Sequence, residues 1–182
     1  MGNEDHYEIH AKELGRKLAL ENIELVYGGA KVGLMGVVAD GVLENSGQVI
    51  GVLPHFLKSK EIAHDGLSEL ILVDSMHERK TKMNELCDGV IALPVGFGTL
   101  EELFEMLTWG QLGLHKKPIG ILNVNGFFDE LIRFLDKMVD KEFLKDSNRK
   151  MILVSKNMDD LLAQMRTYKA PTIEKWITKE NI

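Results

Sequence analysis

Residues 88–102 read Asp-Gly-Val-Ile-Ala-Leu-Pro-Val-Gly-Phe-Gly-Thr-Leu-Glu-Glu. An apolar run typical of a strand stops at a proline, passes two glycines and enters a helical pattern headed by Thr99 and two acids. In an open parallel sheet such a junction lies at the carboxyl end of a strand, where ligands bind. Gly96 and Gly98 allow the backbone to approach a ligand closely, and the amides that open the next helix suit a phosphate. Because Glu102 adds a carboxylate beside this anion site, the stretch indicates chemistry on a nucleotide or sugar phosphate.

The same residues have a structural interpretation. Thr99-Leu100-Glu101-Glu102 fits a capping box, in which the first residue and the Glu three positions later satisfy each other's backbone. A capping Glu turns back onto its own helix and does not face a substrate. From the residues alone, both interpretations stay open.

The rest of the chain alternates between strand and helix patterns. Strands are predicted over residues 24–27, 48–53, 70–73, 89–93, 118–122 and 151–154. Helical patterns lie between them, with a polar loop after residue 53. This order predicts a Rossmann-like α/β fold with a doubly wound parallel sheet, in a single domain over residues 1–170 with a tail over 171–182. The chain opens on a polar segment and a helix, so the first strand of such a fold is expected to be missing.

Composition narrows the class of protein. The chain has 182 residues, of which 45% are hydrophobic and 27% charged, as in ordinary globular domains. A net charge of −6 argues against a general nucleic-acid binder. Cys87 is the one cysteine, so no internal disulfide can form. Neither a signal peptide nor a membrane-spanning apolar run is evident, and we expect a reducing, cytoplasmic setting.

A glycine-rich turn follows the first predicted strand, over residues 27–36. It lies between strand and helix, as a phosphate loop does, but it has neither the dinucleotide spacing nor the terminal Gly-Lys-Ser/Thr of a P-loop. No acid follows the strand that ends at Leu53, so NAD is not expected. The structural alternative is tight strand-to-helix packing through Gly33 and Gly36.

A charged segment opens the helix predicted from Met76. Ser75 and Glu78 fit a capping box that starts this helix. Arg79 and Lys80 then lie near the helix N-terminus, where cations are disfavoured, and an anionic ligand would explain them. The alternative is a solvated charged face. No cluster of His, Cys and carboxylates has the spacing of a metal site.

Together these motifs resemble the Lonely Guy (LOG) family. The resemblance runs from about residue 10 to about residue 165 and is carried by Tyr27-Gly28-Gly29, Gly33-Leu34-Met35-Gly36, Met76-His77-Glu78-Arg79-Lys80, Pro94 to Glu102, Thr108-Trp109, Gln111-Leu112-Gly113 and Lys117-Pro118. Members of this family are cytokinin riboside 5'-monophosphate phosphoribohydrolases. The resemblance implies a Rossmann-like fold, a homodimer and no cofactor or metal.

It also implies a reaction and its residues. The expected substrate is an adenosine monophosphate, such as AMP or prenylated AMP, whose N-glycosidic bond is hydrolysed to free base and ribose 5-phosphate. Arg79 and Glu102 match the catalytic pair. The expected substrate-binding residues are Glu61, Arg79, Lys80, Gly96, Phe97, Gly98, Thr99, Leu100, Glu101, Glu102 and Thr108. Neither a nucleic acid nor a membrane is expected as a partner.

Two departures from the family pattern support an alternative. Val95 stands where the family has a glycine, and a β-branched residue is costly there if the backbone needs a positive φ. The family's opening strand with its Cys-Gly-Ser-Ser-like turn also has no match. The alternative is a catalytically weakened nucleotide-binding or carrier protein on the same fold. Lysine decarboxylation, an older label for such sequences, is rejected because no Schiff-base lysine with a partner for a pyridoxal ring nitrogen is evident.

Overall fold

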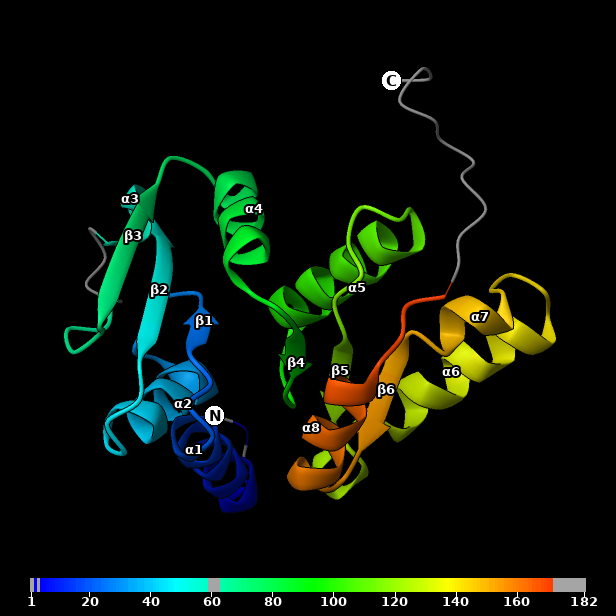
Figure 1. Ribbon diagram of the computed structural model, residues 1–182, viewed down its shortest axis with the longest axis horizontal. Helices are drawn as coiled ribbons and strands as arrows, with labels where there is room; N and C mark the ends of the chain where they lie inside the picture. The colour runs from blue at the N-terminus through cyan, green and yellow to red at the C-terminus, as the bar shows by residue number, and fades with distance from the viewer. Residues whose placement is uncertain (1, 3, 59–62, 172–182) are drawn as a thin grey trace. The chain divides into compact units, whose positions relative to one another are not determined.

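The computed structural model describes residues 2, 4–58 and 63–171. The chain divides into two compact units, Met1–Cys87 and Asp88–Ile182, and each forms a parallel three-stranded sheet with helices packed on it (Figure 1). The α/β, Rossmann-like fold predicted from the alternation is thereby confirmed. The predicted single domain over 1–170 remains a prediction, and residues 172–182 of the tail lie outside the described residues.

The first unit contains a sheet in the order β1-β2-β3. Its elements are α1 (Asp5–Leu20), β1 (Leu25–Tyr27), α2 (Gly33–Leu43), β2 (Val49–Pro54), α3 (His55–Lys58), β3 (Glu69–Val73) and α4 (Met76–Leu86). The central strand β2 is buried along its whole length, which explains its continuous apolar sequence. Helices α1 and α2 pack closely through glycines, since a Cβ on Gly15 would lie 2.3 Å from the carbonyl oxygen of Val38.

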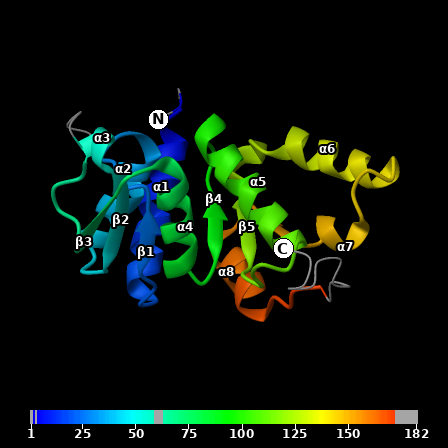
Figure 2. The same ribbon diagram turned by 90° about the horizontal axis from the view of Figure 1, so that it is seen from above.

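The second unit contains a sheet in the order β4-β5-β6, of which Figure 2 shows β4 and β5 side by side. Its elements are β4 (Val90–Ala92), α5 (Phe97–Gln111), β5 (Ile119–Leu122), the 3-10 turn η1 (Val124–Gly126), α6 (Asp129–Asp140), α7 (Asp146–Arg149), β6 (Ile152–Ser155) and α8 (Met158–Thr167). Ile119 and Ile121 share a buried cluster with Leu103 of α5 and Leu135 of α6. Gly120 faces the other way and packs against α8, because successive residues of a strand point to opposite faces.

Two features differ from the sequence-based expectation. The short helices α3 and α7 were not predicted; each has four residues and none of them is buried. Helix α5 begins at Phe97, two residues before the Thr99 start that the pattern suggested.

In both units the strands are parallel, so the turns after β1 and β3 lie at the carboxyl edge of the first sheet, and the turn after β4 lies at the carboxyl edge of the second sheet.

Candidate nucleotide site

Arg79 is a buried cation. It is the fourth residue of α4, and 8% of its surface is exposed. Its Nε donates a hydrogen bond to the carbonyl oxygen of Val52 on β2, over 3.1 Å. A buried guanidinium is tolerated only where its N–H groups find partners, because desolvating an unpaired charge is very costly. The alternative of a solvated charged face is therefore wrong for Arg79, while its neighbour Lys80 is half-buried.

The start of α4 agrees with its sequence. Ser75 is the N-cap, and its Oγ accepts from the amide of Glu78 over 3.1 Å. The Glu78 carboxylate accepts in turn from the amide of Asp74, one residue before the cap, over 2.8 Å. The helix begins at Met76 as predicted, and these bonds hold the turn that presents Arg79 to the sheet.

The glycine turn after β1 uses its glycines for different reasons. Gly29 and Gly33 have φ values of +73° and +66°, a region that side chains rarely adopt. Gly36 is there for close packing, because a Cβ would lie 2.2 Å from the carbonyl oxygen of Lys31. The packing interpretation thus holds for Gly36, whereas at Gly33 a Cβ would have no neighbour within 4 Å and the backbone conformation explains the glycine.

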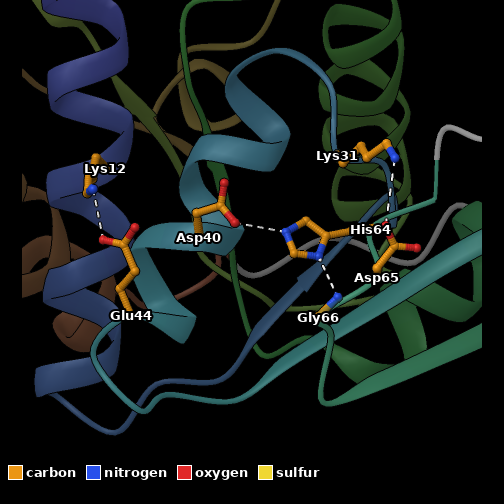
Figure 3. A network of polar contacts seen from close by, with 7 residues as sticks. All are labelled: Lys12, Lys31, Asp40, Glu44, His64, Asp65 and Gly66. Carbon is orange, nitrogen blue, oxygen red and sulfur yellow. Dashed lines mark hydrogen bonds and ion pairs between the residues drawn. The ribbon is translucent and has the colours of Figure 1, made fainter.

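Residues 63–66 are fastened to this turn (Figure 3). The amide of His64 donates to the carbonyl oxygen of Gly29 over 3.0 Å, and Ala63 forms an isolated antiparallel bridge with Ala30. The His64 ring reaches Asp40 of α2, with 2.9 Å between Nε2 and Oδ1. Lys31 and Asp65 add an ion pair at 3.7 Å. The pairing of His64 with Asp40 has no local sequence signal, because the two residues lie 24 positions apart in the chain.

The turn after β4 leads into α5 without a side-chain cap. Gly96 is the N-cap, and no side chain among the described residues hydrogen-bonds to the helix start in the capping position. Thr99 is the third helical residue, so the capping box proposed for Thr99 and Glu102 is wrong. A Cβ on Gly96 or Gly98 would have no neighbour within 4 Å, so the space around this backbone is open. Open space beside the N-terminus of a helix, where the first N–H groups have no acceptor within the helix, favours binding of an anion.

The side chains of this junction differ in exposure. Phe97 is 92% exposed, and Glu101 is exposed as well. Thr99, Leu100 and Glu102 are half-buried. Thr108, further along α5, is exposed, and its Oγ1 donates to the carbonyl oxygen of Phe104 over 2.7 Å, as a helical threonine commonly does.

Val95 adopts an ordinary backbone conformation. The residues with positive φ other than glycine are Asn22, Ser46, Asn125 and Glu142 among those that the structure describes, so Val95 is not one of them. Its side chain packs partly buried against the core cluster of the second unit. A β-branched residue is therefore accommodated at this position without the backbone strain that a positive φ would cause.

The expected site residues come from both units. Arg79 and Lys80 belong to the first unit, and Gly96 to Glu102 with Thr108 belong to the second. Glu61 lies outside the described residues. Among residues 2, 4–58 and 63–171, no group of His, Cys, Asp and Glu is placed to hold a metal ion. Within the same ranges, no helix is both long and apolar enough to cross a membrane.

Comparison with known proteins places the chain among close relatives. A family model described as "possible lysine decarboxylase" matches residues 35–165. A cytokinin riboside 5'-monophosphate phosphoribohydrolase of Arabidopsis thaliana is 42% identical over 98% of this chain and 83% of its own length. A second enzyme of that name from the same plant is 44% identical over 92% of this chain and 74% of its own length.

Solved structures share the fold at lower identity. The molybdenum cofactor carrier protein of Chlamydomonas reinhardtii matches with a TM-score of 0.66 and 22% identity, over 90% of this chain and 88% of that one. The molybdenum cofactor binding protein of Rippkaea orientalis matches with a TM-score of 0.67 and 25% identity, over 88% of both chains. The Chlamydomonas likeness is evidence of a common fold alone.

Proposed function

Because the chain belongs to the Lonely Guy family of phosphoribohydrolases, we propose that it hydrolyses the N-glycosidic bond of adenosine 5'-monophosphates. The products are the free base and ribose 5-phosphate. The observation that carries the proposal is the 42% identity, over 98% of this chain, to a relative named for this reaction. AMP and prenylated AMP are the proposed substrates, and no cofactor is needed for the chemistry.

The reaction needs a carboxylate near the sugar. As the bond between C1' and the base nitrogen breaks, positive charge builds on the ribose and the electron pair leaves with the base. A water oxygen bonds to C1', one of its protons stays on the new hydroxyl group, and the other ends on the departing base. We assign Glu102 to stabilise the cationic sugar and to activate this water. Its location within α5, rather than in a capping box, supports this role.

We assign Arg79 to neutralise negative charge on the substrate. A guanidinium can neutralise either the phosphate or the departing base, and its planar fork suits both. Burial strengthens such an interaction, because the local dielectric is lower than in water. Lys80 is assigned to the nucleotide as a point charge.

The substrate phosphate is proposed as an anchor. The open, uncapped start of α5 offers backbone amides to an anion. Binding energy from this remote group positions the sugar for reaction. Gly96, Phe97, Gly98, Thr99, Leu100, Glu101 and Thr108 are proposed to line this part of the site, together with Glu61 from outside the described residues.

The test is incubation of the purified protein with AMP, with isopentenyladenosine monophosphate and with the matching nucleosides, followed by chromatography for free base. We expect base from the nucleotides only. Comparable turnover of nucleoside and nucleotide would contradict the phosphate anchor. Binding of every nucleoside monophosphate without turnover would favour the carrier alternative, although Val95 itself gives no backbone reason for lost chemistry.

We also propose that the chain works as a cytoplasmic homodimer. Apolar side chains are exposed on α5 and just beyond it, namely Phe104, Leu112 and Leu114. Exposed apolar side chains of this size favour burial against a partner surface. Light scattering coupled to size-exclusion chromatography measures the oligomeric state directly, and a monomeric mass at micromolar concentration would exclude the dimer.

A further inference from the structure

We infer that Gly28 is a positioning residue for Arg79, because its missing side chain provides the space that the guanidinium occupies. The inference concerns the orientation of Arg79, and its catalytic consequence rests on the proposed function. Nothing in the motif resemblance assigns a role to Gly28 beyond its place in a glycine turn.

The contact between the two residues is very close. A Cβ built on Gly28 would lie 1.9 Å from Nη2 of Arg79, 3.0 Å from its Cζ and 3.4 Å from its Nε. Non-bonded atoms do not approach so closely, so an alanine side chain at position 28 and the observed guanidinium exclude each other. The guanidinium therefore lies directly against the backbone of the first glycine of the turn.

The guanidinium cannot move aside without loss. Its Nε donates to the carbonyl oxygen of Val52 in a buried hydrogen bond of 3.1 Å. Tyr27, the last residue of β1, pairs with Gly51 of β2, so Gly28 directly follows β1 and Val52 is the next residue of β2. Arg79 is thus hydrogen-bonded to β2, and its guanidinium lies against the backbone after β1, where Gly28 has no side chain.

Space, rather than backbone conformation, explains the glycine at this position. Gly28 is absent from the residues with positive φ, whereas Gly29 has a φ of +73°. An alanine at position 28 could adopt the backbone conformation and would conflict only with Arg79. This separates Gly28 from Gly29, where alanine would be strained whatever the space.

The consequence is that Gly28 determines where the charge of Arg79 lies. A planar guanidinium anchored at Nε has its terminal nitrogens in a defined direction. A methyl group at position 28 displaces the group or breaks the bond to Val52, and small displacements of a reacting group lower the rate strongly.

The test combines Gly28→Ala with Arg79→Ala and a control glycine. Gly47→Ala is the control, since a Cβ there would lie 2.6 Å from Cγ1 of Val42 and 2.8 Å from Cβ of Ala19. It imposes a steric conflict in the same unit without involving Arg79. We expect G28A to lower kcat on AMP by roughly tenfold to a hundredfold. We expect G47A to keep kcat, even if its urea midpoint falls.

The decisive measurement is the stability cycle, which does not depend on activity. If the methyl group introduced by Gly28→Ala conflicts with Arg79, the loss of stability in G28A disappears when Arg79→Ala is added, so the two changes are not additive. Gly47→Ala should remain additive with Arg79→Ala. Additive losses for G28A and R79A, or a kcat of G28A within about twofold of the parent protein, would overturn the inference. If the parent protein releases no base from any nucleotide, the proposed function fails and the stability cycle still decides the role of Gly28.

Discussion

The imidazole of His64 is engaged at both nitrogens, with Asp40 as one of its partners. The amide of Gly66 donates to Nδ1 over 3.1 Å, so the ring proton lies on Nε2 and is donated to Oδ1 of Asp40 over 2.9 Å (Figure 3). Through the amide of His64 the same residue holds the carbonyl of Gly29. The pair therefore ties α2, the glycine turn and residues 63–66 into one arrangement.

Removing either partner should destabilise the protein. The His64 side chain is 11% exposed and that of Asp40 is 56% exposed, so solvent screens part of the interaction. We expect Asp40→Ala or His64→Ala to lower the free energy of unfolding by about 1 kcal/mol. Urea unfolding measures the change. Glu44→Ala, which breaks the exposed ion pair with Lys12, is the control and should cost less. Equal losses of unfolding free energy for E44A and D40A would mean that the contact between His64 and Asp40 contributes no more than an exposed ion pair.

The two predicted capping boxes differ in outcome, and stability measurements can separate them. Ser75 caps α4 through a hydrogen bond to the amide of Glu78, so Ser75→Ala should cost about 1 kcal/mol. Thr99 lies inside α5, and Thr99→Ala should cost clearly less. Thermal or urea unfolding of the two variants provides the comparison. A loss for T99A as large as that for S75A would restore Thr99 as a cap.

The buried hydroxyl of Tyr27 makes the free energy of unfolding depend on pH in the alkaline range. Its hydroxyl is buried with no hydrogen-bond partner among the described residues. Burial, and secondarily the charge of Asp40, raises the pKa of Tyr27 above its ordinary value. Unfolded, the residue titrates near pH 10, so above that pH the folded chain binds more protons than the unfolded chain. The free energy of unfolding then falls as pH rises, and the contribution of Tyr27 is complete only below about pH 10.

Tyr27→Phe tests this dependence. Because the hydroxyl is unpartnered among the described residues, we expect the variant to equal or exceed the parent protein in stability at neutral pH, by up to about 1 kcal/mol. The gap should widen in its favour above about pH 10, where the parent loses the Tyr27 contribution. Urea unfolding at neutral and alkaline pH measures both effects. A variant that is less stable at neutral pH would show that the hydroxyl has a partner in solution.

Val95→Gly should reduce stability and leave the rate unimproved. Val95 has no positive φ and packs against the core of the second unit. Replacing it by the family's glycine removes apolar contact and adds chain entropy to the unfolded state, for a loss of about 1–2 kcal/mol. Urea unfolding and kcat on AMP are measured together. A clear rise in kcat would mean that Val95 strains the loop in a way that its backbone conformation does not explain.

Glu102→Gln tests the catalytic carboxylate. The amide keeps the shape of the side chain and removes its charge, so kcat on AMP should fall by about a hundredfold or more. Because Glu102 does not cap α5, we expect the variant to keep the fold, and urea unfolding checks that the loss of activity is not a loss of structure. Glu105→Gln, one turn further along α5 and also half-buried, is the matched control. Similar activity in E102Q and E105Q would remove Glu102 from the chemistry.

Local sequence determined where the strands lie. All six predicted strands match the structure to within one residue at each end. The reason is that buried parallel strands are continuous apolar runs bounded by polar or glycine-rich turns, a signal that needs no tertiary information. The N-cap of α4 was equally local, since Ser75 and Glu78 are three residues apart. The helices α3 and α7 escaped because four residues, none of them buried, carry no apolar periodicity.

Tertiary structure decided what the charged and glycine residues do. Arg79 near a helix N-terminus looks the same in sequence whether it faces water or is buried, and its hydrogen bond to the carbonyl of Val52 exists only in the folded chain. Gly28 and Gly29 are adjacent and chemically identical, yet one provides space for a guanidinium and the other a positive φ. His64 finds Asp40 across 24 positions because the fold brings the segment before β3 onto α2. Such roles depend on distances between segments, which a linear pattern does not contain.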